Sequence, residues 1–367
     1  MKYYIIAGEA SGDLHGSNLI KALKQQDPEA DIRCWGGDLM QAAGAHLVKH
    51  YRNLAFMGFI EVVRNLRTIL RNLSFCKKDI IAFRPDAIIL VDYPGFNLRI
   101  AQWAKAQELR VIYYISPQVW AWKESRVNII RNCVDKMLVI LPFEKDFYKK
   151  WDYPVEYVGH PLVEVVNEWQ VQHPHLQKSN TIALLPGSRK QEILKKLPVM
   201  LEVSRFFPDY EFVVAMAPGM EKTFYNNLLS GYQNVKAVTG KTYSLLMQSV
   251  AALVTSGTAT LETALFGVPE VVCYKGSTIS YEIAKRVIKI KYISLVNLIM
   301  DKPVVKELIQ HELTVQNVKE ELQDLLTHTG RIEQMKQDYV ALKNLLSEGG
   351  DASFNAATSI SNFLRGE

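Results

Sequence analysis

Short apolar runs alternate along the chain with longer stretches of helical period. Runs typical of buried strands occur in the first half at residues 3–7, 32–35, 87–92, 111–115, 136–141 and 155–158. Further runs follow at 181–185, 211–216, 235–239, 251–254 and 270–274. Helical patterns separate them at 14–24, 59–83, 97–108, 190–206, 221–229 and 243–250, and dominate the tail from 306 to 364.

The alternation occurs in two blocks, which predicts an α/β protein of two doubly wound parallel-sheet, Rossmann-like domains facing a cleft. We expect an N-terminal domain at 1–165 and a second domain at 181–345. The segment 166–180 is polar, carries His173-Pro174-His175 and is interpreted as a linker. A C-terminal helix at 346–367 is expected to pack back on an N-terminal domain. Ligands of such sheets bind at the carboxyl ends of the strands.

Composition and charge narrow the classes of partner and site that the chain can have. Apolar residues at 48% and charged residues at 22% are ordinary for a globular protein. The net charge of +5 favours an anionic partner, but no RNA-binding signature supports nucleic acid. The four cysteines form no CxxC pair, which indicates neither zinc nor a disulfide framework and fits a reducing cytoplasm. We expect no signal peptide, and no apolar run reaches transmembrane length.

The stretch 251–274 carries the strongest chemical pattern. Its pattern predicts a strand, a small-residue loop, a helix, a turn and a second strand, in that order. Ser256-Gly257-Thr258 precedes the helix, whose free N–H groups and dipole suit an anion. Glu262 could accept two hydrogen bonds from a ribose diol. The pattern predicts a nucleotide-sugar site, and a capped crossover helix without a ligand is the alternative.

The turn after the first strand is Gly8-Glu9-Ala10-Ser11-Gly12-Asp13. It departs from GxGxxG, so the dinucleotide-binding fingerprint is absent. Its glycines permit a tight turn from strand to helix. Ser11 or Asp13 either caps a helix that begins near residue 14 or belongs to a loop that faces substrate.

Asp92 ends an apolar strand, where a carboxylate is costly unless it is solvated or paired. There it could serve as a general base toward a hydroxyl group. The alternative is a cap or turn residue before Pro94.

Gly187-Ser188-Arg189 follows the first strand of the second half. A guanidinium matches phosphate oxygens in a bidentate fork. A surface arginine is the alternative, but Ser256 and Glu262 on a neighbouring strand end favour contact with a pyrophosphate.

Three other polar residues keep two interpretations each. Asn297, amid apolar residues, needs partners if buried and either binds substrate or bridges two loops. His15 and His160 follow strand ends and either reach the cleft or are structural. No Asp-x-Asp pair occurs, so no metal site is predicted.

An amphipathic helix is predicted from residue 59. Its apolar stripe consists of Phe59, Val62, Val63, Leu66, Ile69 and Leu70. Its basic flank consists of Arg64, Arg67 and Arg71. Such a helix can lie on an anionic bilayer or contact acyl chains. The alternative is a helix that faces the core.

Motifs along nearly the whole chain resemble those of the lipid-A-disaccharide synthases. In order they are GEASGD (8–13), FMGFIEV (56–62), DYPGFN (92–97), SPQVWAW (116–122), LPFEKDFY (141–148), GHP (159–161), LLPGSR (184–189), SGTATLE (256–262), AKR (284–286) and YISLVNL (292–298). SPQVWAW together with LPFEKDFY is the most specific combination.

The resemblance implies a glycosyltransferase fold of the B type and an inverting reaction that needs neither metal nor cofactor. The donor would be UDP-2,3-diacylglucosamine and the acceptor 2,3-diacylglucosamine 1-phosphate. The products would be a β-1,6-linked disaccharide 1-phosphate and UDP. A homodimer with exchanged C-terminal segments is also implied, as is a peripheral place on the cytoplasmic face of the inner membrane.

Residue roles follow from the matching positions. Asp92 would be the base, because Gly95 stands where some relatives carry a second carboxylate. The donor site would comprise Gly187, Ser188, Arg189, Ser256, Gly257, Thr258, Glu262 and Asn297. The acceptor side of the cleft would comprise Gly8, Glu9, Ser11, Gly12, Asp13, His15 and Asn97.

Other functions would require different sequence features. Another B-type UDP-sugar enzyme, such as a 2-epimerase or a soluble-acceptor transferase, would share the fold and the ribose glutamate without needing the stripe at 59–70. A non-catalytic binding protein would bind UDP without turnover. An NAD-dependent oxidoreductase would need the missing GxGxxG.

Overall fold

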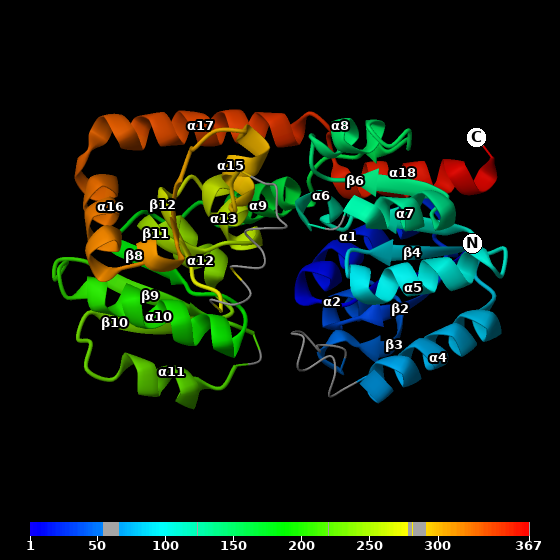
Figure 1. The fold of residues 1–367 in the computed structure, drawn as a ribbon, viewed down its shortest axis with the longest axis horizontal. Helices are drawn as coiled ribbons and strands as arrows, with labels where there is room; N and C mark the ends of the chain where they lie inside the picture. Colours follow the sequence, from blue (N-terminus) through cyan, green and yellow to red (C-terminus); the bar gives the residue numbers. More distant parts are fainter. Residues whose placement is uncertain (54–65, 123, 219, 278–280, 282–290, 367) are drawn as a thin grey trace. The chain divides into compact units, whose positions relative to one another are not determined.

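The computed structural model describes residues 1–53, 66–122, 124–218, 220–277, 281 and 291–366 (Figure 1). The chain divides into two compact units. The first comprises Met1–Pro161 with Ser347–Glu367, and the second comprises Leu162–Leu346.

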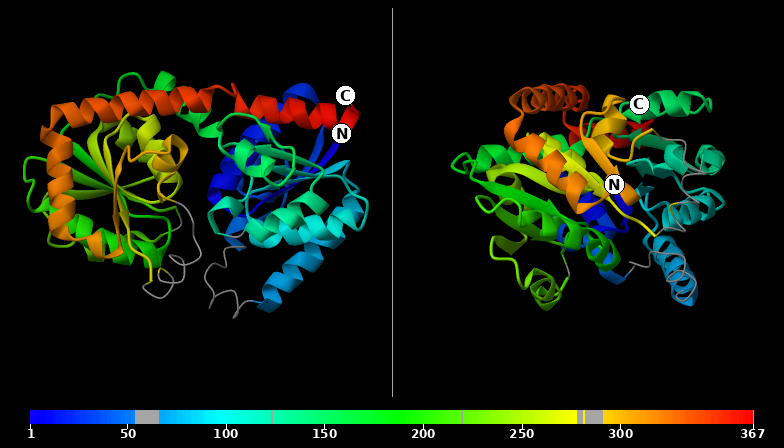
Figure 2. Two further views of the ribbon diagram at one scale, coloured as in Figure 1. Left: turned by 45° about the horizontal axis from the view of Figure 1, so that its top comes forward. Right: turned by 60° about the vertical axis from the view of Figure 1, so that its left-hand side comes forward.

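The first unit is built on a seven-stranded sheet of order β3-β2-β1-β4-β5-β6-β7, in which every pair is parallel. Its strands are β1 (Lys2–Ala7), β2 (Asp31–Gly36), β3 (His46–His50), β4 (Ala87–Val91), β5 (Val111–Tyr114), β6 (Lys136–Val139) and β7 (Glu156–Tyr157). All residues of β4 and β5 are buried, because helices cover both faces of the sheet (Figure 2).

The helices of this unit are α1 (Ala10–Gln26), α2 (Asp38–Ala42), η1 (Tyr51–Asn53), α4 (Leu66–Phe83), α5 (Pro94–Lys105), α6 (Val119–Trp122), η2 (Glu124–Arg126), α7 (Val127–Cys133), α8 (Glu144–Lys149) and α18 (Ala352–Arg365). Helix α18 packs beside α1 although the two are at opposite ends of the sequence. Gln26 Nε2 donates to Thr358 Oγ1 at 2.7 Å, and Arg110 donates to the Leu364 carbonyl at 2.9 Å. The last helix therefore completes the first unit.

The second unit contains a six-stranded parallel sheet of order β10-β9-β8-β11-β12-β13. Its strands are β8 (Thr181–Leu185), β9 (Glu211–Met216), β10 (Val235–Thr239), β11 (Ser249–Thr255), β12 (Glu270–Tyr274) and β13 (Lys306–Ile309). Its helices are α9 (Pro161–Gln172), α10 (Lys190–Ser204), α11 (Lys222–Leu229), α12 (Thr242–Gln248), α13 (Thr258–Leu265), α15 (Leu295–Met300), η3 (Gln310–Glu312), α16 (Val315–Thr327) and α17 (Thr329–Ser347). Two parallel α/β sheets confirm the predicted fold class.

One local expectation was wrong, and two strands were not predicted. Helix α9 occupies the first part of the predicted linker at 166–180, because Leu162, Val163 and Val166 give it a buried face. Strand β13 lies at the start of the tail, which was expected to be mainly helical and is so in α16, α17 and α18, and β3 was not predicted. Both are edge strands with one partner strand, and they lack the continuous apolar run of a central strand.

Candidate active site

Two consecutive left-handed residues end strand β4. Asp92 has φ 43° and Tyr93 has φ 50°, a conformation that costs a non-glycine residue roughly 1–3 kcal/mol. The Asp92 carbonyl accepts hydrogen bonds from Tyr113 Oη at 2.5 Å and from Asn97 Nδ2 at 2.7 Å. These bonds to the Asp92 backbone carbonyl hold the strained turn.

The Asp92 carboxyl is poised to exchange a proton near neutral pH. Burial raises the pKa of Asp92 to about 7, and the nearby charge of Glu9 acts in the same direction. Glu9 follows β1, which pairs with β4, so the two acids share one end of the sheet. A carboxyl group with such a pKa at the carboxyl edge of a parallel sheet has the properties of a general base.

The β1–α1 turn requires its first glycine. A Cβ at Gly8 would lie 2.3 Å from the Tyr93 ring, so a side chain there would displace that ring. Gly12 is buried and Ser11 is exposed. Helix α1 begins at Ala10, earlier than expected, and Glu9 occupies its N-cap without a side-chain cap bond. Neither Ser11 nor Asp13 therefore caps this helix.

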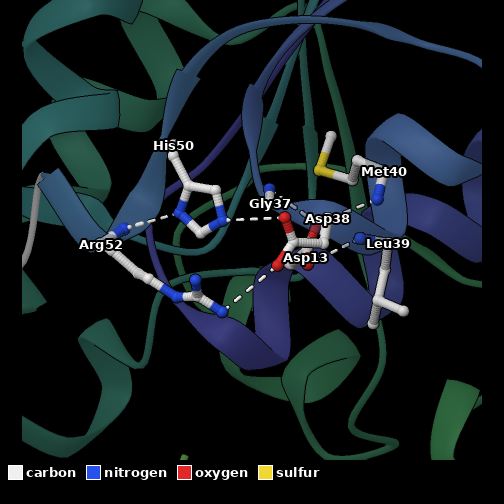
Figure 3. A network of polar contacts seen from close by, with 7 residues as sticks. All are labelled: Asp13, Gly37, Asp38, Leu39, Met40, His50 and Arg52. Atoms are coloured by element: carbon white, nitrogen blue, oxygen red, sulfur yellow. Dashed lines mark hydrogen bonds and ion pairs between the residues drawn. The ribbon is translucent and has the colours of Figure 1, made fainter. Parts of the chain in front are cut away.

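Asp13 instead accepts hydrogen bonds at the N-terminus of another helix. Its buried carboxylate accepts backbone hydrogen bonds from Gly37 at 2.7 Å, Leu39 at 3.2 Å and Met40 at 3.0 Å, at the N-terminus of α2 (Figure 3). These amides occupy the Asp13 carboxylate, and a contact between Asp13 and the acceptor stays a prediction.

Asn97 is likewise structural. It is fully buried, and its Nδ2 donates to the carbonyls of Ile6 at 3.3 Å, Val91 at 3.2 Å and Asp92 at 2.7 Å. The side chain ties β1 to β4 and supports the Asp92 turn. A contact between Asn97 and the acceptor stays a prediction beside this supporting role.

His15 and His160 are buried near one another in the first unit. Burial lowers the pKa of His15 to about 4, and burial together with His15 lowers the pKa of His160 to about 3. Both rings are therefore neutral at pH 7. Among the described residues, none hydrogen-bonds to Nδ1 of His15.

In the second unit, Gly187 and Arg189 follow β8. Gly187 has φ +121°, and a Cβ there would approach Glu192 Oε2 to 2.7 Å. Arg189 occupies the N-cap of α10, where its side chain is 49% exposed and lies 3.2 Å from Glu192 Oε1. Ser188 lies between them in an exposed turn. An accessible guanidinium at a helix N-terminus suits a phosphate group.

The neighbouring strand β11 ends in the loop Ser256-Gly257-Thr258, which begins α13. Gly257 has φ +139° and is exposed, as is Thr258. Ser256 Oγ donates to the Ile293 carbonyl at 2.7 Å, which anchors the loop. The first amides of α13 are thus presented to solvent beside the Gly187 turn, on adjacent strand ends.

Glu262 lies on α13, partly buried. Its Oε1 accepts a hydrogen bond from Tyr243 Oη at 2.9 Å, and burial raises its pKa to about 7 against the lowering effect of that bond. None of the described residues hydrogen-bonds to Oε2. Tyr243 fixes the carboxyl group and leaves one oxygen able to accept from a hydroxyl pair.

Asn297 bridges two segments of its own unit. Its Nδ2 donates to the Val305 carbonyl and to Glu307 Oε1, both at 2.9 Å, and its Oδ1 accepts from the Val305 amide at 2.9 Å. Both amide hydrogens are used, as the bridging interpretation requires, and a contact between Asn297 and the donor stays a prediction.

Helix α4 carries part of the predicted amphipathic stripe. Phe59, Val62, Val63 and Arg64 are outside the described residues, as are the motif positions 56–62 and 284–286 and the Leu66 side chain. Leu70 is 55% exposed, with Arg67 and Arg71 exposed on the same helix, whereas Ile69 is partly buried against the core. Phe75 and Ile81 extend the exposed apolar surface. Within the described ranges, no helix is long and apolar enough to cross a bilayer.

Sequence reasoning missed Lys196. This residue of α10 is only 3% exposed, and its Nζ donates to Thr255 Oγ1 at the end of β11. The available signal was a lysine among the apolar positions Ile193, Leu197 and Met200 of the helix.

Comparisons with known proteins assign the fold. A UDP-GlcNAc 2-epimerase from Neisseria meningitidis, solved with UDP-GlcNAc, superposes over 100% of both chains with a TM-score of 0.68 and 14% identity. The calicheamicin glycosyltransferase covers 99% of this chain and 98% of its own, with a TM-score of 0.61 and 15% identity. Identities this low show the fold alone, which is the predicted glycosyltransferase B type.

The family is assigned from sequence. Lipid-A-disaccharide synthases from Syntrophus aciditrophicus and Psychromonas ingrahamii are 38% and 39% identical to this chain. The alignments cover 97% of this chain and 96% of the first relative, and 98% of this chain and 97% of the second. The model of the lipid-A-disaccharide synthetase family matches residues 3–359. The chain therefore belongs to the lipid-A-disaccharide synthetase family.

Proposed function

We propose that the chain transfers diacylglucosamine from UDP-2,3-diacylglucosamine to the primary hydroxyl of 2,3-diacylglucosamine 1-phosphate, with inversion. The products are the β-1,6-linked disaccharide 1-phosphate and UDP. The observation that carries the proposal is the family match over residues 3–359, which includes both Asp92 and Arg189. The relatives' names favour this reaction over a 2-epimerase or a soluble-acceptor transferase.

Asp92 is the proposed general base. As the acceptor oxygen forms its bond to the anomeric carbon, the hydroxyl proton passes to the Asp92 carboxylate and the bond between that carbon and the diphosphate oxygen breaks. The hydroxyl is a very weak acid, so proton removal matters in the transition state, where such help is typically worth about 10²–10⁴-fold. The fixed turn and the pKa of about 7 support this role.

The second unit is proposed to hold UDP. Arg189 and the α13 amides after Ser256 would balance the charge that grows on the departing diphosphate, in the role a metal takes in other enzymes. Glu262, fixed by Tyr243, would accept hydrogen bonds from the ribose hydroxyls.

Both substrates are lipids, so we propose that α4 contacts acyl chains or the inner leaflet at the cytoplasmic face. Exposed Leu70 and Phe75, with Arg67 and Arg71 nearby, provide apolar surface flanked by positive charge. We also propose a homodimer in which C-terminal segments are exchanged. A partner's α18 would then make the contact that α18 makes here with α1.

The test is a two-substrate assay with purified protein, in the presence of either EDTA or Mg²⁺. We expect UDP release that depends on the acceptor, a disaccharide 1-phosphate detected by mass spectrometry, and equal rates in both buffers. UDP binding without turnover would instead indicate a binding protein. Conversion of the donor without acceptor would indicate an epimerase, and dependence on Mg²⁺ would remove the charge-balancing role from Arg189.

A further inference from the structure

A buried lysine lies at the carboxyl edge of the second sheet. Lys196 extends from α10 toward the end of β11, where its Nζ donates to Thr255 Oγ1. Strands β8 and β11 are neighbours, and their ends carry the Gly187 turn and the Ser256 loop. A Cβ built at Gly187 would lie 3.5 Å from Lys196 Nζ, so the ammonium group lies directly under that turn. It thus lies between the two loops of the proposed diphosphate site.

The ammonium group has little counter-charge. Glu192 Oε2 lies 4.0 Å away, and the other oxygen of the same carboxylate is 3.2 Å from Arg189. One carboxylate therefore faces two cations. Among the described residues, the other titratable groups near Lys196 are Lys195, which adds positive charge, and Cys273, whose pKa burial raises to about 12 so that the thiol stays neutral.

A buried ammonium group whose nearest described carboxylate lies 4.0 Å away is costly unless an anion offsets its charge. Burial lowers the pKa of Lys196, and the charge of Arg189 acts in the same direction. A bound diphosphate would supply the missing negative charge at the edge where the two loops meet. Glu192 could then share its charge with Lys196 while Arg189 turns toward phosphate.

We propose that Lys196 is a second basic group of the donor site beside Arg189, a positioning residue whose charge strengthens diphosphate binding through Glu192 and Thr255. The inference rests on the proposed function, because it assumes that UDP binds at this edge. It adds a residue of α10 that shares the diphosphate charge with Arg189.

The experiment compares Lys196→Met and Lys196→Gln with wild-type protein. Methionine fills a similar volume without charge or hydrogen bond, whereas glutamine can still donate to Thr255. UDP affinity is measured by calorimetry, uridine affinity by NMR titration, and KM and kcat by the two-substrate assay. Lys195→Met is the matched control, because it removes the same charge from the adjacent, less buried position.

We expect both Lys196 variants to bind UDP roughly ten- to a hundredfold more weakly, as for loss of a charge-assisted interaction. KM for the donor should rise more than kcat falls, and uridine affinity should stay within about threefold, because uridine carries no phosphate. Melting temperatures identify any variant that fails to fold, and Lys195→Met should resemble wild type.

Three outcomes would overturn the inference. UDP affinity within about threefold of wild type in both variants would make Lys196 a packing residue and leave the proposed function intact. An equal loss of uridine and UDP affinity would indicate a general distortion, and a loss confined to Lys196→Met would assign the effect to the Thr255 hydrogen bond. Wild-type protein that does not bind UDP would overturn the donor site as well.

Discussion

Glu270 is predicted to destabilise the folded protein at neutral pH. It begins strand β12, is 0% exposed, and neither of its carboxylate oxygens has a hydrogen-bond partner among the described residues. Burial raises the pKa of Glu270 well above its usual value. We therefore expect the folded chain to hold a neutral acid there, while the unfolded chain ionises it at a pKa of about 4.3.

The magnitude has two parts. A neutral carboxyl buried without hydrogen bonds costs about 1–3 kcal/mol at any pH. In addition, the free energy of unfolding falls by about 1.4 kcal/mol for each pH unit over which the unfolded chain is ionised and the folded chain is not. The pKa of Glu270 is higher in the folded chain than in the unfolded chain, so the folded chain binds the proton more tightly. The stability that this proton contributes is complete below the unfolded pKa and is lost as pH rises toward the folded pKa.

Two substitutions separate these parts. Glu270→Gln removes the pH-dependent part but keeps a buried polar group, whereas Glu270→Met removes both. In urea unfolding between pH 5 and pH 8, the advantage of either variant over wild type should grow with pH, and Glu270→Met should be the more stable variant throughout. Glu333→Gln, at an exposed position of α17, is the control and should run parallel to wild type. Parallel curves for Glu270→Gln would refute the reasoning, because they would mean that Glu270 has a counter-charge in the fold.

Other predictions concern activity. Asp92→Asn should lower kcat by about 10²–10⁴-fold without changing UDP affinity, and a variant that keeps more than about a tenth of wild-type kcat would make Asp92 a turn residue. Wild-type kcat should rise with pH through about 7, since the base must be ionised, and Glu9→Gln should move that rise to lower pH. Arg189→Ala should weaken UDP binding by about 1.5–3 kcal/mol in calorimetry. Leu70→Ser should weaken binding to anionic vesicles in a flotation assay with little change in melting temperature, because Leu70 is 55% exposed, whereas Phe75→Ser should also lower the melting temperature, because the Phe75 ring lies 6.0 Å from that of Trp35.

The central strands were predictable because burial on both faces requires an apolar run that is visible in the sequence. Strands β4 and β8 read as continuous apolar runs, AIILV and TIALL, and both were predicted. The edge strands β3 and β13 are half-exposed and carry charged or imidazole side chains, which protect a free edge but remove the pattern. A strand that is buried on one face only has too few apolar residues for the sequence pattern to distinguish it from a loop or a helix.

It was harder to tell from the sequence which polar residues at strand ends bind ligands and which are structural. Asp13 and Asn97 have the residue types and spacing of ligand-binding positions, yet amides and carbonyls from other elements occupy them. Their partners include Gly37, which is distant from Asp13 in sequence, so no local pattern could indicate the pairing. Lys196 was missed for a related reason, since only the fold brings it under the Gly187 turn.

Completion of the first unit by α18 has a consequence during synthesis. The ribosome makes β1 to β7, then the whole second unit, and only then the helix that covers part of α1. At roughly 5–20 residues per second, this interval lasts tens of seconds. During that interval the surface of α1 that α18 covers is exposed in the nascent chain. If the proposed homodimer with exchanged C-terminal segments forms, this interval gives the α18 of a neighbouring chain on the same polysome access to that surface.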